Sequence, residues 1–196
     1  MVATASPFGA RAVKSLASRY NSTGSNLFPI ANGYATNIFA GDFVVRVADG
    51  TIEKATGTTT LSTIGIFIGA EYTEPNLNYR LRAQFYPANT VGVVGGVDQI
   101  NGYVIDDPEI VFKIQADGPI ALADVGSNAA IVQGAGSIAN GNSTNALDQS
   151  SLATTSTLPL RILEIERSPE NVAGDAFTDV LVKFNTGHQY LNTTGV

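Results

Sequence analysis

The sequence holds few residues that could do chemistry. It contains no cysteine and a single histidine, His188, which excludes thiolate nucleophiles, cysteine-bound clusters and a histidine-built metal site within one chain. His188 could activate a serine, with Asp175 or Asp179 as the carboxylate that orients it, but the sequence lacks the nucleophile-elbow pattern of such hydrolases. His188 stands in a polar stretch, so we interpret it as a solvent or interface histidine.

Three carboxylates stand close together at Asp106, Asp107 and Glu109, around Pro108. A calcium loop needs six or more oxygen ligands on a spaced pattern, and this run lacks that spacing. Aspartates beside a proline favour a turn instead. Paired carboxylates for glycoside hydrolysis meet only in space and stay open at this point, although the sequence has no tryptophan as a sugar platform.

The glycine-rich stretch 133–141 superficially resembles a phosphate-binding loop. It lacks the third glycine at the required offset, a following lysine and a strand–loop–helix context. No other pattern indicates a catalytic centre. We therefore expect no enzymatic activity, no catalytic residue, no cofactor and no metal.

Charge is placed unevenly along the chain. The 196 residues suit one domain with an extended arm. Residues 1–41 carry three basic side chains and no acidic ones, while the rest of the chain carries 17 acidic ones, and the net charge is −6. An acidic body argues against nucleic-acid binding, and no apolar stretch approaches the ~20 residues that span a bilayer. The basic N-terminal segment is either a mobile tail or an arm that docks on an acidic protein surface.

Short strand patterns and turn signals recur through most of the chain. Residues 79–86 alternate, with Tyr79, Leu81, Ala83 and Phe85 on one face and Tyr86 with the arginines on the other. Further strands are predicted at 43–47, 51–55, 64–73, 103–105, 109–115, 129–132, 158–167 and 176–184, with one helical turn at 120–125. Asp49-Gly50 predicts a type I′ hairpin turn. These patterns predict an all-β fold, an antiparallel β-sandwich or barrel.

This prediction divides the chain into two regions. Residues 1–30 form an extended N-terminal arm, and residues 31–196 form a β body. A flexible loop, rich in glycine, asparagine and serine, is expected within that body at 133–151.

Several turns and strand ends carry a resemblance to a known family. They are Ser6–Gly9, Gly41–Val44, Asp49–Ile52, Ile64–Phe67, Val104–Pro108, Ala123–Ala129, Leu158–Leu163 and Asn192–Val196. Together they resemble small structural proteins encoded in the head gene clusters of tailed phages, the capsid cement or decoration proteins. The resemblance spans nearly the whole chain. Its motifs are turns and strand ends, so it indicates a fold family and not a particular chemistry.

The resemblance implies a non-enzymatic virion protein that binds the outside of the major capsid shell at capsomer junctions and stabilises the shell. It implies self-association, as a homotrimer, and a place on the capsid exterior after assembly in the host cytoplasm. We expect no nucleic-acid or membrane partner. The candidates for capsid or subunit contacts are basic and aromatic residues of the arm and its surroundings: Arg11, Lys14, Arg19, Tyr20, Phe28 and Tyr34.

Two alternatives remain open: a hydrolase built on a β scaffold, and a head-fibre, tail or receptor- and glycan-binding component of the virion. In the second case, exposed aromatic rings would form a binding platform. The candidate tyrosines are Tyr20, Tyr34, Tyr79, Tyr86, Tyr103 and Tyr190.

Overall fold

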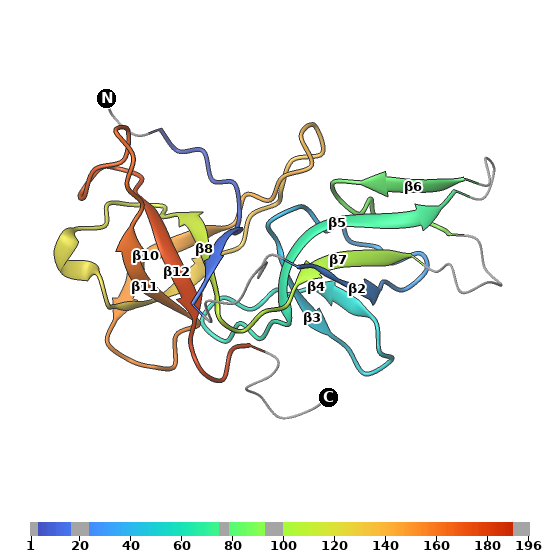
Figure 1. Ribbon diagram of the computed structural model, residues 1–196, viewed down its shortest axis with the longest axis horizontal. Coiled ribbons are helices and arrows are strands. Elements are labelled where there is room, and N and C mark those ends of the chain that lie inside the picture. Colours follow the sequence, from blue (N-terminus) through green and yellow to red (C-terminus); the bar gives the residue numbers. More distant parts are fainter. Residues whose placement is uncertain (1–3, 17–23, 75–78, 93–99, 190–196) are drawn as a thin grey trace.

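The computed structural model describes residues 4–16, 24–74, 79–92 and 100–189 (Figure 1). These residues form β-strands and one 3₁₀ turn, Leu122–Asp124, and contain no α-helix. The predicted all-β fold is confirmed: two antiparallel sheets pack together as a sandwich. The helical turn predicted at 120–125 is also confirmed. No helical segment in the described part of the chain has the length and apolar character that crossing a bilayer would need.

Each sheet contains six strands. Sheet A runs in the order β1 (Arg11–Ser15), β8 (Ile110–Gln115), β12 (Asp179–Phe184), β11 (Leu160–Ile165), β9 (Asn128–Val132) and β10 (Ala146–Ala153). Sheet B runs in the order β2 (Asn26–Pro29), β7 (Asn101–Ile105), β5 (Gly65–Thr73), β3 (Phe43–Arg46) and β4 (Ile52–Lys54), and β6 (Arg80–Ala83) pairs with β5.

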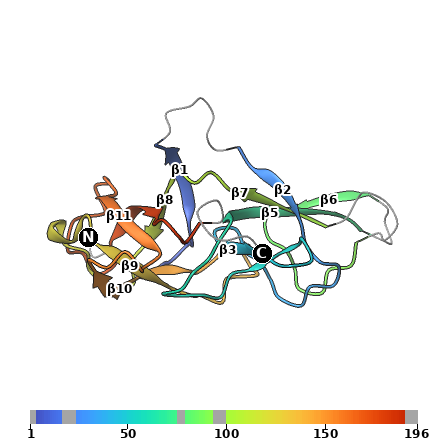
Figure 2. The ribbon, with the colours of Figure 1, turned by 90° about the horizontal axis from the view of Figure 1, so that it is seen from below.

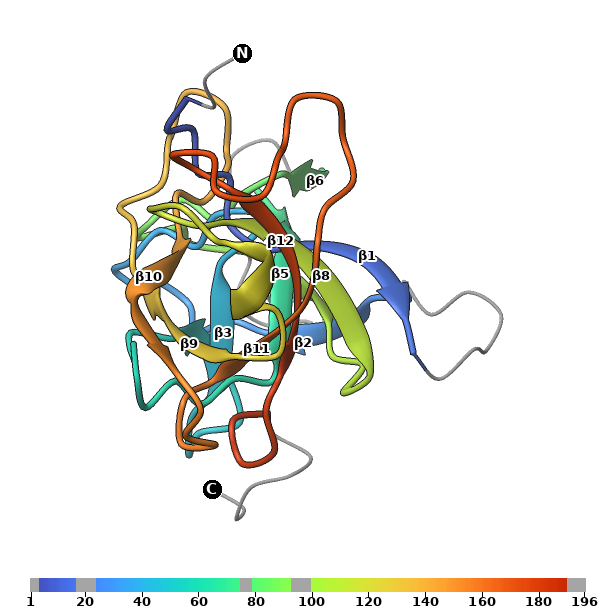
Figure 3. The ribbon, with the colours of Figure 1, turned by 90° about the vertical axis from the view of Figure 1, so that its left-hand side faces the viewer.

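Sheet A curls toward a barrel (Figure 3). A parallel bridge joins Ala116, just after β8, to Leu147 of β10, and the Asp117 N–H donates to the Leu147 carbonyl at 3.0 Å. Five strands thereby almost close on themselves, which protects two edges that would otherwise be open. β1 lies outside this closure as an added strand on β8.

Both sheets contribute to one apolar core. Phe43 of sheet B packs edge-on against Phe112 and Phe184 of sheet A, with ring centroids 5.7 and 5.6 Å apart. The predicted apolar face of the strand at 109–115 is confirmed, because Ile110, Phe112 and Ile114 are all fully buried. A second, smaller cluster lies against sheet B and includes Phe67 and Tyr86.

The hairpin between β3 and β4 differs from its prediction. The Gly50 N–H donates to the Val47 carbonyl and the Val47 N–H donates to the Thr51 carbonyl, which makes a three-residue loop. Gly50 has a φ of +87°, whereas Asp49 keeps a negative φ. The predicted type I′ turn is therefore wrong, because the Asp49 side chain accepts from the Thr51 N–H at 2.9 Å and favours a type I turn followed by a left-handed glycine.

The loop predicted at 133–151 is shorter than expected. Residues 146–151 belong to β10, which pairs with β9 as a hairpin, so the loop prediction is wrong for that part. Residues 133–145 are tied down by their own side chains: Asn145 accepts from the Gly134 N–H at 2.7 Å, and Thr144 accepts from the Gly136 N–H at 3.0 Å.

Candidate functional site

The N-terminal segment forms the open edge of both sheets. β1 pairs with β8 in sheet A, and β2 pairs with β7 in sheet B. Each is the last strand in the order of its sheet, so its outer edge carries no further strand from the described residues. Figure 2 shows β1 beside β8 and β2 beside β7. The described part of the predicted arm, residues 4–16 and 24–30, thus lies along its own body in extended conformation.

β1 presents a mixed basic and apolar surface. Arg11 and Lys14 are exposed, and the Val13 and Leu16 side chains are each 50% exposed. The pairing with β8 shifts register between Ala12 and Lys14, so Val13 is the extra residue of a bulge. Lysine, arginine and a bulge are features by which edge strands avoid unselective pairing.

The beginning of β1 is fixed by an aromatic ring. The Arg11 guanidinium and the Lys113 ammonium lie 5.4 and 5.2 Å from the centroid of the Phe8 ring. Two cations on one ring hold residues near Phe8 against sheet A. The Ser6 N–H adds a bond of 2.8 Å to the Gln115 side chain.

The structure brings together only some of the predicted interface residues. Arg11 and Lys14 share β1. Phe28 lies instead in β2, where the Arg46 guanidinium stacks 5.3 Å from its ring centroid, and it packs against the second apolar cluster. Tyr34 packs there as well, and its hydroxyl accepts from the Lys54 N–H at 3.2 Å. Arg19 and Tyr20 lie outside the described residues.

The tyrosines proposed as a glycan platform fall into different environments. Tyr86 is fully buried, and its burial raises the pKa of its hydroxyl to about 12. Its ring packs 6.1 Å from that of Tyr34, so these two residues stabilise the interior. Tyr79 is exposed, and Tyr103 donates its hydroxyl hydrogen to Glu71. Tyr20 and Tyr190 lie outside the described residues.

The residues considered for a serine–histidine–aspartate triad have separate partners. His188 Nδ1 lies 2.6 Å from the Leu61 carbonyl oxygen. Asp175 accepts from the Val172 N–H at 2.9 Å, and the Asp179 carboxylate lies 3.5 Å from the Lys113 ammonium. In the ranges that the structure describes, no group of three or more His, Asp or Glu residues is placed to hold a metal ion.

The acidic run at 106–109 is a turn, as predicted. The Glu109 N–H donates to the Asp107 carboxylate at 2.8 Å, and the Ile110 N–H donates to the Asp107 carbonyl at 3.1 Å. The Asp106 carboxylate accepts from the Asn26 amide at 3.0 Å, which ties β2 to the end of β7. Glu109 pairs with Lys183 at 2.5 Å.

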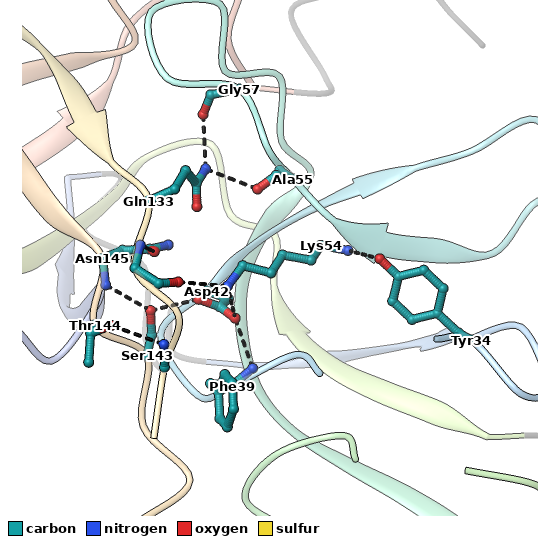
Figure 4. Close-up of polar contacts among 12 residues, drawn as sticks. Tyr34, Phe39, Asp42, Lys54, Ala55, Gly57, Gln133, Ser143, Thr144 and Asn145 are labelled. Carbon is teal, nitrogen blue, oxygen red and sulfur yellow. Dashed lines mark hydrogen bonds and ion pairs between the residues drawn. The ribbon is translucent and has the colours of Figure 1, made fainter. Parts of the chain in front are cut away.

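A buried polar network around Asp42 was not predicted (Figure 4). The Asp42 carboxylate is fully buried and accepts from the Phe39 N–H at 2.9 Å and from the Ser143 hydroxyl at 2.6 Å. The Lys54 ammonium lies 3.1 Å from the same carboxylate and also donates to the Gly134 carbonyl at 3.1 Å. These contacts of the Asp42 carboxylate and the Lys54 ammonium connect β3, β4 and the loop 133–145 to one another.

A second polar cluster lies on sheet B. Glu71 accepts hydrogen bonds from Tyr103 and Arg80, and the Arg82 guanidinium lies 3.4 Å from its carboxylate. Burial alone would raise the pKa of Glu71, but these hydrogen bonds and the two positive charges outweigh burial and lower it. The cluster joins β5, β6 and β7.

In each cluster a carboxylate accepts hydrogen bonds from neighbouring donors and lies beside a cationic side chain. These contacts join strands and loops that are far apart in the sequence. Comparison of the chain with protein-family models, with curated proteins and with solved structures gave no match.

Proposed function

We propose that this chain is a non-enzymatic structural protein of a virion, a cement protein that binds the outside of the major capsid shell at capsomer junctions. It self-associates, as a homotrimer, and touches neither nucleic acid nor membrane. Its action is binding alone: each bound copy adds association free energy to the assembled shell and none to its separate subunits. Repetition over a symmetric shell makes weak contacts effective through high local concentration.

The observation that carries the proposal is the open, basic edge of β1. An edge strand offers unpaired backbone donors and acceptors to a partner strand. Arg11 and Lys14 select an acidic partner, while Val13 and Leu16 supply apolar contact. The resemblance to phage head proteins gives this partner its identity, the major capsid protein. The buried Asp42 network supports the proposal because a bracing protein must resist deformation.

Co-sedimentation with cement-free capsids tests this function. The wild-type chain is expected to pellet with the capsids, and the variant R11Q/K14Q is expected to pellet at least tenfold more weakly. The matched control is R161Q/R167Q, which removes the same charge from exposed positions on β11 and just after it. A wild-type chain that stays in the supernatant contradicts the proposed function, and equal losses for the two variants contradict the role of β1.

A further inference from the structure

The loop between β9 and β10, residues 133–145, carries an exposed apolar side chain at its tip. Ile138 is 69% exposed, and its neighbours Ala139 and Asn140 are exposed as well. The loop contains no charged residue, and Figure 1 shows it projecting from the sheets near the middle of the molecule. One exposed isoleucine alone would be ordinary, but this one stands on an uncharged projection, which can enter a pocket without removing a charge from water.

Hydrogen bonds within the loop hold its tip in place. The Ser137 N–H donates to the Asn142 carbonyl at 2.9 Å, and the Gly141 N–H donates to the Ser137 carbonyl at 2.8 Å. The Asn140 side chain accepts from the Asn142 N–H at 3.0 Å. The position of Ile138 is therefore set before a partner binds, which lowers the entropy cost of association.

The base of the loop is attached to the core of the protein. The Ala40 N–H donates to the Gly141 carbonyl at 3.0 Å, and the Ser143 N–H donates to the Ala40 carbonyl at 2.9 Å. The Ser143 hydroxyl donates to the buried Asp42 carboxylate at 2.6 Å (Figure 4). Force on the tip is therefore transmitted to both sheets.

A pocket of about 600 Å³ opens elsewhere on the molecule, between η1 and the loop after β11, and we call it the η1 pocket. Val125 and Ile165 line it and also pack against the larger core cluster, so the pocket reaches down to the core. Leu122, which is 74% exposed, stands at its rim. Its apolar lining residues are Leu122, Val125, Leu163, Ile165, Pro169 and Ala173.

Much of the polar lining of the η1 pocket already has partners. The Arg167 guanidinium pairs with the Glu164 carboxylate at 2.8 Å, and the Arg167 side chain is 88% exposed, which places this pair at the rim. The Asn171 amide donates to the carbonyls of Glu166 and Asp179 at 2.6 and 2.8 Å. The remaining apolar surface favours an uncharged aliphatic side chain as the occupant.

The tip and the pocket lie on different parts of one copy. Figure 1 and Figure 2 both show η1 at one end of the molecule, whereas the loop between β9 and β10 lies nearer the middle. Ile138 does not line the pocket of its own chain. A second copy of the chain is the partner that offers an apolar tip to this pocket and a matching pocket to this tip.

We propose that Ile138 of one copy inserts into the η1 pocket of the next, so that copies associate head to tail. A contact between two different surfaces closes into a ring when its rotation allows and otherwise gives an open chain. The homotrimer of the proposed function is a closed ring of this kind. The inference rests on that self-association, and it involves neither Arg11 nor Lys14, so capsid binding through β1 is tested independently.

Sedimentation velocity over a range of protein concentrations tests the inference. The variant I138D removes the apolar tip, and L122D/A173D places two carboxylates around the η1 pocket, all at exposed positions. Each is expected to raise the dissociation constant of self-association about tenfold or more, because the burial of one isoleucine is lost. The matched control V91D changes another exposed aliphatic residue and is expected to stay within about twofold of the wild-type constant.

A mixture of the two variants tests the pairing of tip and pocket directly. The I138D chain keeps the pocket, and the L122D/A173D chain keeps the isoleucine, so one contact of wild-type affinity remains between them. The mixture is expected to contain a complex of one copy of each variant and nothing larger, at a concentration where each variant alone is monomeric. Formation of this complex also shows that both variants are folded.

Three results would overturn the inference while self-association itself stands. Neither variant weakens self-association, or both weaken it and their mixture stays dissociated, or I138D loses co-sedimentation with capsids and self-associates as the wild type does, which would place the loop on the capsid. A wild-type chain that is monomeric at every concentration overturns this inference together with the proposed self-association. Co-sedimentation of R11Q/K14Q with capsids then decides the remaining part of the proposed function.

Discussion

Single residues hold together segments that are far apart in the sequence. Asp42 and Ser143 are 101 residues apart, and their side chains meet at 2.6 Å in the interior. The buried pair of Asp42 with Lys54 is favourable only while both partners and their hydrogen bonds are present. Removal of one partner leaves a charge without compensation inside the protein, which costs more than the pair itself contributes.

The variant D42A is expected to lower the free energy of unfolding by about 3–5 kcal/mol, because Lys54 loses its counter-charge in the interior. The double variant D42A/K54M removes both charges and is expected to lose clearly less. Urea denaturation at pH 7 measures both values. The exposed aspartate variant D49A, which removes two turn hydrogen bonds from Thr51, provides the comparison, with a much smaller loss. Equal stability of D42A and D49A would contradict the bracing role of Asp42.

Glu71 gives the stability of the protein a dependence on acid pH. Its pKa in the folded protein lies below the ordinary value of 4.5, so the folded state binds this proton more weakly than the unfolded state does. The stabilisation by the Glu71 carboxylate is therefore fully present above pH 4.5 and is lost as the pH falls through the folded pKa.

We expect the variant E71Q to be less stable than the wild type at pH 7, by about 1–3 kcal/mol, and this difference to shrink below pH 4.5. Urea denaturation between pH 3 and pH 7 measures the difference. E53Q removes a carboxylate from the edge strand β4 and controls for the lost negative charge. A difference between wild type and E71Q that does not vary with pH would show that the charge of Glu71 is not what stabilises the cluster.

At the scale of the elements, local patterns in the sequence predicted most strands. The alternation around Phe112 identified β8 and the face that packs into the core, although Val111 and Gln115 on the other face are buried too. The same reasoning placed Tyr86 on the face of the exposed arginines and was wrong. β6 ends at Ala83, and the chain bends at residues 84 and 85, which turns Tyr86 into the second apolar cluster.

Other features depend on pairings that no local pattern contains. The Asp49 carboxylate accepts a hydrogen bond from the Thr51 N–H. This bond favours a turn in which Asp49 keeps a negative φ over the type I′ turn, in which its φ would be positive. The order of the strands could not be derived either, because β1 and β2 look alike as short irregular segments and yet join different sheets. For the candidate site, the sequence identified Arg11 and Lys14, whereas their place at the open edge of sheet A depends on the pairing of β1 with β8.

At the scale of the whole molecule, the shared core makes the two sheets depend on each other. Phe43 of sheet B has its ring partners in sheet A, and residues of both sheets belong to the larger apolar cluster. Neither sheet can lose its structure without exposing the inner face of the other. Unfolding should therefore occur as one transition.

The tyrosines allow this to be measured, since the chain has no tryptophan. The described tyrosines all lie in sheet B or in loops next to it, at positions 34, 72, 79, 86 and 103. In the variant Y20F/Y190F, which keeps only the described tyrosines, tyrosine fluorescence therefore reports on sheet B, whereas far-ultraviolet circular dichroism reports on both sheets. We expect the two signals to give the same urea midpoint and the same slope. A midpoint for fluorescence that differs from that for circular dichroism would mean that the sheets unfold separately.

The pairing of β1 with β8 also has a consequence for biosynthesis. The bond from Ser6 to Gln115 joins residues 109 positions apart, and ribosomes add about 5–20 residues per second. The first strand of sheet A to leave the ribosome therefore waits on the order of ten seconds for its neighbour to be translated. The segment that is made first therefore stays without its partner strand until β8 has been translated, and both edges of β1 are open during that time.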